Sequence, residues 1–436
     1  MSKRIALISE HASPLAILGG CDCGGQNVYV GQLARGLGRL GFSVDVFTRR
    51  DDMTLPEIVP WGDGVRVIHV PAGPARPVRK EALLPYMEDF TRYMDSWLRQ
   101  GRRHYDLVHA NFFMSGMVAR AIKERWGIPY VVTFHALGAV RQLHQGRDDC
   151  FPKERNLIES EVVADADAIL AECPQDAKDL SCFYGAPAQK LKLVPCGVDP
   201  EQFQPLDKRL ARAKIGLATA EPVLLHVGRM VPRKGVATVI EALARLRDQH
   251  GLAAQLLIVG GESDTANSAR TPEIGRLEGL AHRLNVARQV TFVGRRRPDQ
   301  LRPYYAAADL FVTTPWYEPF GITPLEAMAC GTPVIGSAVG GIKYTVRHKE
   351  TGYLVPPRNP AAVALYIAHA VRHPEERHSL GRQALARTQA LFTWQKVCQQ
   401  ASRVYLEVLG HSPSRGLGVP ANHRPEASEP PRSFLN

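Results

Sequence analysis

The chain has 436 residues, of which 45% are hydrophobic and 22% charged, and its formal net charge is +11. This length exceeds what one hydrophobic core serves, so we expect two domains, and the composition excludes a disordered or fibrous protein. No run of eighteen apolar residues occurs and the start does not match an export signal, so we expect a cytoplasmic protein. Zinc-finger spacing and RNA-binding aromatic signatures are missing, which favours an anionic small substrate or an anionic membrane surface over nucleic acid.

The cysteines give no framework for the fold. There are eight, too few for a disulfide scaffold in a chain of this length, and only Cys21 and Cys23 lie close together. A structural zinc site needs about four ligands, usually in two close pairs. The CxC spacing of Cys21 and Cys23 also differs from the CxxC pattern of redox sites. We therefore expect no metal site.

Short apolar runs alternate with helical segments along the first half of the chain. The segment at 27–42 has helical periodicity and ends near Gly41. This alternation predicts a parallel sheet with crossover helices. The expected strands are 4–9, 43–48, 65–70, 106–111, 130–135 and 168–173.

The same alternation starts again after residue 200, which predicts a second sheet. The fold class is therefore α/β, with two facing Rossmann-like domains. Their bounds are predicted at 1–198 and 199–391, with a hinge in the Pro- and Gly-containing stretch 194–206. The expected strands are 223–228, 254–261, 289–294, 309–314 and 332–337.

The end of the chain divides into a helix and a tail. A helix at about 392–409 is expected to cross back to the first domain, and residues 411–436, rich in Pro, Ser and Arg, are expected to be disordered. Open α/β sheets bind ligands at the carboxyl ends of their strands. With two sheets, those ends can face each other across a cleft that holds a donor on one side and an acceptor on the other.

The segment "HVGRMVPRKG" (226–235) follows the first strand of the second half. Arg229 and Lys234 lie in a loop just before a helix, which begins near Gly235. Two cations beside a helix N-terminus form an anion site, because unpaired backbone N–H groups and the helix dipole add to their charge. A solvated basic turn is the alternative interpretation of this segment alone.

The segment "WYEPFGITPLEAMACGTPVIGS" (316–337) carries two glutamates in the pattern E-x7-E, Glu318 and Glu326. Thr323 is expected to cap a helix and Glu326 to close a capping box, which stabilises the helix by about 1 kcal/mol. Glu318 precedes that helix, where its carboxylate can accept sugar hydroxyls while the amides of 320–323 receive phosphate oxygens. We expect a functional role for Glu318 and both roles for Glu326.

Together these motifs resemble the nucleotide-sugar half of retaining glycosyltransferases of the two-Rossmann-domain (GT-B) type, in glycosyltransferase family 4. The resemblance extends over about residues 3–408. It is closest to the group that holds sucrose-phosphate synthases and the inositol-phosphate glycosyltransferases of mycothiol synthesis. The segment "GGQ" (24–26) matches the first branch, and "HASPLA", "NVYV" and "DLVHA" match the second.

This resemblance implies roles for particular residues. Arg229 and Lys234 would neutralise the donor pyrophosphate, Glu326 would hold the ribose, Glu318 would contact the donor sugar, and His135 would lie beside the reacting sugar. The catalytic set is therefore His135, Glu318, Arg229 and Lys234. The expected donor-binding residues also include Gly24, Gly25, Phe320, Gly321, Ile322, Thr323 and Glu326, and the acceptor-binding residues are Gln26, Asn27, Lys80 and Arg155.

More specific roles are expected for two glycines and two cationic residues. Gly24 and Gly25 would let backbone N–H groups approach a phosphate closely, whereas no chemistry is required of Cys21, Asp22 or Cys23. Lys80 and Arg155 match positions that hold an acceptor phosphate in relatives. The segment "HANFF" (109–113) departs from the mycothiol branch, because it has Asn111 in place of a histidine and Phe112 in place of a tyrosine. The acceptor therefore stays open.

The resemblance implies a retaining hexosyl transfer from UDP-glucose or UDP-N-acetylglucosamine to a small sugar or cyclitol acceptor, which can carry a phosphate. It implies no cofactor and no catalytic metal. The alternative is a transferase that extends a lipid-linked or surface glycan, with the basic stretch 97–104 at the membrane. A glycoside hydrolase is disfavoured, since its two carboxylates must flank the scissile bond. The sequence indicates no oligomeric state.

Overall fold

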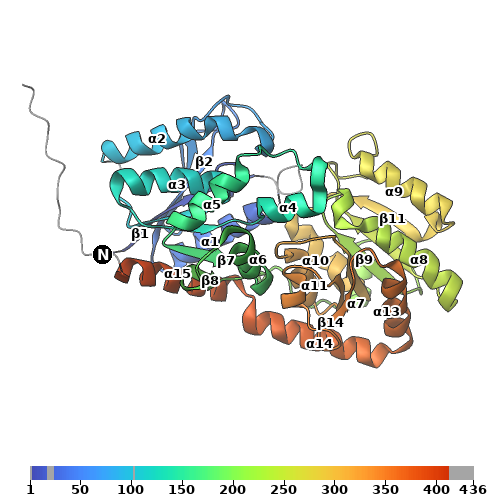
Figure 1. Ribbon diagram of the computed structural model, residues 1–436. Coiled ribbons are helices and arrows are strands. Elements are labelled where there is room, and N and C mark those ends of the chain that lie inside the picture. Colours follow the sequence, from blue (N-terminus) through green and yellow to red (C-terminus); the bar gives the residue numbers. More distant parts are fainter. Residues whose placement is uncertain (1, 17–23, 102–103, 412–436) are drawn as a thin grey trace, which may run out of the picture.

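A computed structural model gives the structure of residues 2–16, 24–101 and 104–411. These residues form two sheets, each covered by helices on both faces, lying side by side (Figure 1). The α/β prediction with two Rossmann-like halves is confirmed. Cys21, Asp22, Cys23 and nearly all of the predicted tail lie outside the described residues. The division at residues 198 and 391 stays a prediction.

The first sheet has eight strands among the described residues, in the order β3-β4-β2-β1-β5-β6-β7-β8. All its neighbouring pairs are parallel except β3 with β4. The strands are β1 (Arg4–Ile8), β2 (Ser43–Arg49), β3 (Ile58–Pro60), β4 (Val65–Val70), β5 (Leu107–Asn111), β6 (Tyr130–Thr133), β7 (Ala168–Ala171) and β8 (Leu191–Leu193). The helices of this half are α1 (Gly25–Arg39), α2 (Met87–Arg99), α3 (Phe113–Trp126), α4 (Gly138–Gln145), α5 (Arg155–Asp165) and α6 (Pro174–Tyr184).

The second sheet has six parallel strands among the described residues, in the order β11-β10-β9-β12-β13-β14. The strands are β9 (Val223–Val227), β10 (Gln255–Val259), β11 (Val290–Gly294), β12 (Leu310–Thr313), β13 (Val334–Ser337) and β14 (Gly352–Val355). The helices are α7 (Lys208–Lys214), α8 (Val236–His250), α9 (Pro272–Arg283), α10 (Pro298–Ala307), α11 (Ile322–Ala329), α12 (Ile342–Thr345), α13 (Pro360–Arg372), α14 (Pro374–Leu391) and α15 (Trp394–His411).

The predicted strands fall within a few residues of these positions because most are buried apolar runs, although β11 is only partly buried. The central strands are β1 and β9. Every residue of β9 is buried, and so is every residue of β1 after Arg4. In each sheet the strand order reverses beside that strand, which is where such folds place ligands. The loops after β1 and β9 therefore mark the expected edge of a site.

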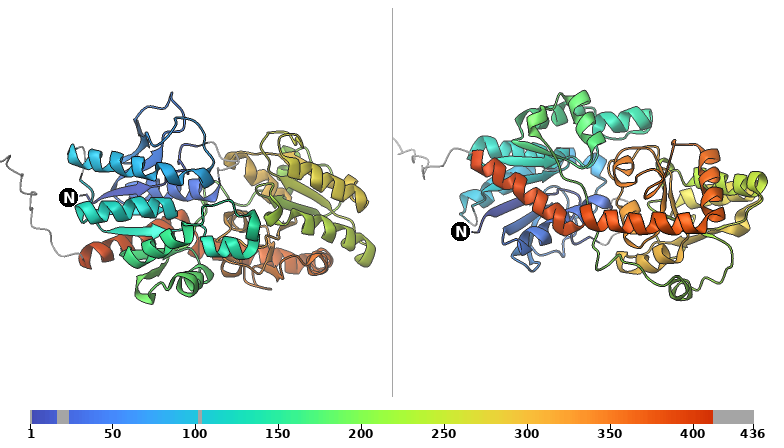
Figure 2. Two further views of the ribbon diagram at one scale, coloured as in Figure 1. Left: turned by 45° about the horizontal axis from the view of Figure 1, so that its top comes forward. Right: turned by 90° about the horizontal axis from the view of Figure 1, so that it is seen from below.

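The chain passes between the two halves at two adjacent places. Val198 N–H donates to Phe392 O at 2.8 Å, and Trp394 N–H donates to Val198 O at 3.2 Å. Helices α14 and α15 run one after the other along the underside of the molecule, so that α15 returns to the first half and packs on α1 (Figure 2). The predicted C-terminal helix that crosses back is therefore confirmed. The preceding helix α14 was not predicted.

Candidate active site

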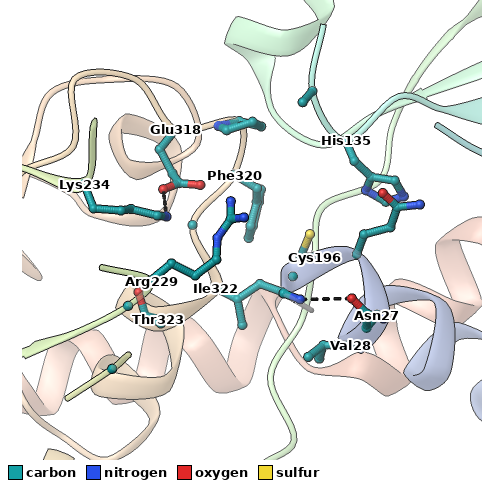
Figure 3. Close-up of a pocket in the computed structure, with 18 of the residues that line it drawn as sticks. Asn27, Val28, His135, Cys196, Arg229, Lys234, Glu318, Phe320, Ile322 and Thr323 are labelled. Atoms are coloured by element: carbon teal, nitrogen blue, oxygen red, sulfur yellow. Dashed lines mark hydrogen bonds and ion pairs between the residues drawn. The ribbon is translucent and has the colours of Figure 1, made fainter. Parts of the chain in front are cut away.

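A cavity of about 340 Å³ lies between the two halves, at the carboxyl ends of their strands. Figure 3 shows its two walls, with His135, Asn27, Val28 and Cys196 on one side and Arg229, Lys234, Glu318 and Phe320 on the other. Every predicted site residue lines this cavity. The roles assigned to those residues stay predictions, since the structure holds no substrate.

The basic turn after β9 is fixed against the segment that follows β12. Pro232–Lys234 form one turn of 3-10 helix, and Gly235 then adopts a left-handed φ of +71°. A Cβ on Gly235 would lie 1.9 Å from Thr314 O, so only glycine fits there. Trp316 N–H donates to Arg233 O at 2.9 Å. These contacts bring the basic turn beside Glu318.

Lys234 and Glu318 form an ion pair across this junction. Their side chains are 18% and 13% exposed, so both charges are largely removed from water. Burial lowers the pKa of Lys234 to about 8, although Glu318 opposes that effect. Burial would raise the pKa of Glu318, but Lys234 and the neighbouring arginines outweigh it and hold the pKa below its usual value.

Arg233 is a third cation in the cavity wall, and the sequence analysis missed it. Its guanidinium lies 5.1 Å from the Tyr317 ring centroid. Among the described residues, its buried Nη1 atom has no hydrogen-bond partner. A buried guanidinium N–H without a partner costs free energy, which a ligand oxygen would recover. The signal was present in the sequence, because Arg233 directly precedes Lys234.

The loop that carries Glu318 is held by two glycines from the segment after β13. Gly340 has a φ of +43°, and a Cβ there would lie 1.7 Å from Glu318 O. Gly341 N–H donates to Pro319 O at 3.1 Å. The backbone of the Glu318 loop is therefore positioned by close backbone contact that any larger residue would prevent.

The predicted capping box of Thr323 and Glu326 is wrong. Helix α11 begins at Ile322, and its N-cap is Gly321, whose left-handed φ of +92° ends the preceding loop. Thr323 therefore lies inside the first turn, and Glu326 points into the protein. Glu326 accepts a hydrogen bond of 2.6 Å from the Tyr305 hydroxyl, and burial raises its pKa to about 7.

The glycine-rich segment ends at the start of α1. Gly24 is the N-cap, and its N–H donates to Asn27 Oδ1 at 2.9 Å. Asn27 Nδ2 donates to Ser13 O at 2.9 Å, so this buried side chain positions the loop, and its contact with the acceptor stays a prediction. A Cβ on Gly24 would meet nothing within 4 Å. A side chain at position 24 would therefore collide only with a bound ligand.

Arg155 lines the cavity from the first half of the chain and is only 1% exposed. Its Nε donates to Glu159 Oε1 at 2.8 Å, and its Nη2 donates to Ala136 O. Its guanidinium lies 4.9 Å from the Phe112 ring centroid. Among the described residues, Nη1 has no partner. The two N–H groups of Nη1 therefore remain for an anionic ligand, in a cavity that Lys80 also lines.

The two walls of the cavity also touch directly. The His144 ring of α4 stacks on Tyr317 from the Glu318 loop, with ring centroids 4.9 Å apart and planes at 14°. Gln145 Nε2 donates to the Tyr317 hydroxyl. This contact joins the first half of the chain to the loop that holds the donor-side carboxylate.

In the described part of the chain, the side chains that could group around a metal ion are His369, His373 and Glu376, none of which lines the cavity. The expectation of no catalytic metal stays a prediction. No helix within the described ranges combines the length and hydropathy needed to cross a bilayer.

Comparisons with known proteins match both halves. Residues 24–197 match the family model described as "Glycosyl transferase 4-like domain", and residues 207–387 match "Glycosyl transferases group 1". A D-inositol 3-phosphate glycosyltransferase from Actinosynnema mirum is 37% identical over 92% of this chain and 97% of its own length. Its counterpart from Corynebacterium jeikeium is 34% identical over 97% and 99%.

Solved structures agree with these matches. A sucrose-phosphate synthase from Thermosynechococcus elongatus has a TM-score of 0.86 and 36% identity, covering 94% of this chain and all of its own. The fold of this chain is therefore the GT-B fold. The chain belongs to glycosyltransferase family 4 and is a hexosyltransferase that uses a nucleotide-sugar donor.

Proposed function

We propose that the protein transfers a hexosyl unit, with retention of configuration, from UDP-glucose or UDP-N-acetylglucosamine to a small phosphorylated sugar or cyclitol. The observation that carries this proposal is the presence of two cationic groups in one cavity. Arg229, Arg233 and Lys234 lie on one side, and Lys80 and Arg155 on the other. A diphosphate and a separate phosphate would satisfy the two groups.

The proposed chemistry follows from where charge develops. As the bond to the anomeric carbon breaks, negative charge grows on the departing diphosphate, beside the basic turn and the N-terminus of α11. Stabilisation there lowers the barrier most. The acceptor hydroxyl attacks from the same face, and its proton passes to the departing phosphate oxygen. Glu318 would bind hydroxyls of the donor sugar, and Glu326 those of the ribose.

The acceptor class is supported by the relatives' names, since the two compared by sequence are D-inositol 3-phosphate glycosyltransferases. Arg155 Nη1 supports it independently, because it is buried and without a partner among the described residues. A lipid-linked acceptor has weaker support here. Arg99, in the basic stretch proposed to touch a membrane, already pairs with Asp95 at 2.9 Å.

The experiment is a screen for nucleotide release. Donors are tested first alone and then with matched pairs of acceptors that differ only by a phosphate, and product configuration is read by NMR. We expect nucleotide release to require a phosphorylated acceptor. Lys80→Ala should raise the KM for that acceptor about tenfold or more. The exposed Lys178→Ala is the matched control. Equal rates with the unphosphorylated partner, or turnover only with lipid-linked glycans, would contradict the proposal.

A further inference from the structure

His135 is held at both of its ring nitrogens. Nδ1 lies 2.9 Å from Glu172 Oε1, and Nε2 lies 3.1 Å from Asn111 Oδ1. The His135 side chain is 9% exposed. Its φ of +58° is unusual for a residue other than glycine and persists only where the surroundings enforce it. Glu172 lines the cavity with His135, and the fully buried Asn111 lies behind them.

The orientation of the Asn111 amide decides which atom faces Nε2. Asn111 Nδ2 lies 3.3 Å from Ile8 O and 3.4 Å from His109 O. The opposite orientation would place Oδ1 against two carbonyl oxygens, which only accept hydrogen bonds. Oδ1 therefore faces His135, and Nε2 must carry a proton to donate to it.

The groups around Nδ1 favour a proton on that nitrogen too. The Cys196 thiol lies 3.2 Å from Glu172 Oε1, and burial, together with Glu172, raises its pKa well above the usual range. The thiol thus keeps its proton and donates to Glu172. Burial, and then Glu172, raise the pKa of Asp176 to about 8, so Asp176 is neutral at neutral pH. Glu172 is left as the acceptor of both donors.

Among the described residues, Tyr29 and His109 also lie near His135, and neither is charged. Tyr29 of α1 lies edge-on to the ring at 4.8 Å between centroids, and burial raises its pKa well above its usual value. Burial, and then His135, lower the pKa of His109 to about 3, so His109 is neutral. Glu172 is therefore the acceptor that these groups leave for His135 Nδ1.

We propose that Asn111 and Glu172 are positioning residues that hold His135 as an imidazolium, with an N–H on each ring nitrogen. The role of this imidazolium in catalysis rests on the proposed function. In that reaction His135 would be a fixed cation beside the reacting sugar and could not take the acceptor's proton. The proton would then go to the departing phosphate.

The charge state is tested on the full-length protein without substrate. Histidine labelled with ¹⁵N reports the protonation of each ring nitrogen, and His135→Gln identifies the His135 signals by their loss. We expect both nitrogens of His135 to be protonated at pH 7.5. In Glu172→Gln we expect one of them to lose its proton at the same pH. A neutral ring in the unmodified protein would overturn the proposal.

Kinetics test the positioning role separately. Glu172→Gln and Asn111→Leu should lower kcat at least tenfold while the donor KM stays within about twofold, because His135 loses its fixed charge or orientation. Glu172→Asp, which keeps the carboxylate, should recover part of kcat. Glu161→Gln, at an exposed position, is the matched control, and thermal unfolding shows whether each variant is folded. Imidazolium signals with unchanged kcat would refute the catalytic role and leave the charge assignment standing.

Discussion

The ammonium of Lys234 is paired with the carboxylate of Glu318, although the two residues are 84 positions apart in the chain. The pair joins the two motifs that the sequence pointed to separately, the basic turn after β9 and the glutamate loop after β12. A bound pyrophosphate would compete with Glu318 for Lys234. Donor binding and the position of the sugar-binding carboxylate are therefore coupled in the proposed reaction.

Replacing Lys234 by Met should separate stability from activity. The single change leaves the buried Glu318 charge without its partner and should cost about 1–3 kcal/mol of unfolding free energy. Adding Glu318→Gln removes that charge and should recover most of the stability. Denaturant unfolding measures both effects. Neither variant should transfer sugar, and full activity in the double variant would contradict the proposed roles.

Affinity for UDP-glucose should depend on pH with a maximum between about 7 and 8. Burial raises the pKa of Glu326 to about 7, so the carboxylate that would accept the ribose hydroxyls forms only as the pH rises through that value. Burial lowers the pKa of Lys234 to about 8, so its charge is lost above it. Calorimetry between pH 6 and 9 measures the profile, since the pyrophosphate diester does not titrate there.

Glu326→Gln provides the control for that profile. The amide does not ionise, so the rise in affinity on the acidic side should disappear while the fall above pH 8 stays. Tyr305→Phe removes the hydrogen bond that favours the ionised form of Glu326, so the acidic limb should move to higher pH. An unchanged acidic limb in both variants would show that Glu326 does not bind the ribose.

Gly340→Ala should impair donor binding without any change to a cavity side chain. The new methyl would lie 1.7 Å from Glu318 O, and alanine does not readily adopt the φ of +43°. The Glu318 loop must therefore shift, and we expect donor affinity to fall at least tenfold in calorimetry. Gly216→Ala, also at positive φ but with nothing within 4 Å, controls for backbone strain alone.

Tyr317→Leu should weaken the contact between the two walls of the cavity. The change removes the stack on His144 and the hydrogen bond from Gln145. We expect the free variant to have a larger radius of gyration in X-ray scattering and to become compact when UDP-glucose is added. Identical profiles for variant and unmodified protein, with and without donor, would count against closure about the 194–206 connection.

The strands and the outline of the cavity could be predicted because buried apolar runs and the two charged motifs are local patterns. Strands β3, β8 and β14 were missed. Strands β3 and β8 are only three residues long and partly exposed, and β3 is an antiparallel edge. Helix α14 was missed because its polar sequence buries few residues, among them Leu380 and Ala384.

The errors at the site have a tertiary origin. Thr323 and Glu326 have the spacing of a capping box, but the backbone of Gly321 starts the helix two residues earlier than that box requires. The hydrogen bonds of the Asn27 amide with Ser13 and Gly24 could not be predicted from sequence either, and its contact with an acceptor stays a prediction. The contacts of His135 with Asn111 and Glu172 join residues from three strand ends, which no local pattern reveals.

Because α15 packs on α1, the first half of the molecule is not continuous in the chain. During synthesis on the ribosome, its sheet can assemble early, but the apolar face that receives Cys398, Ala401 and Tyr405 stays uncovered until residues 394–411 emerge. Truncation before residue 394 would therefore damage the part of the enzyme that is made first.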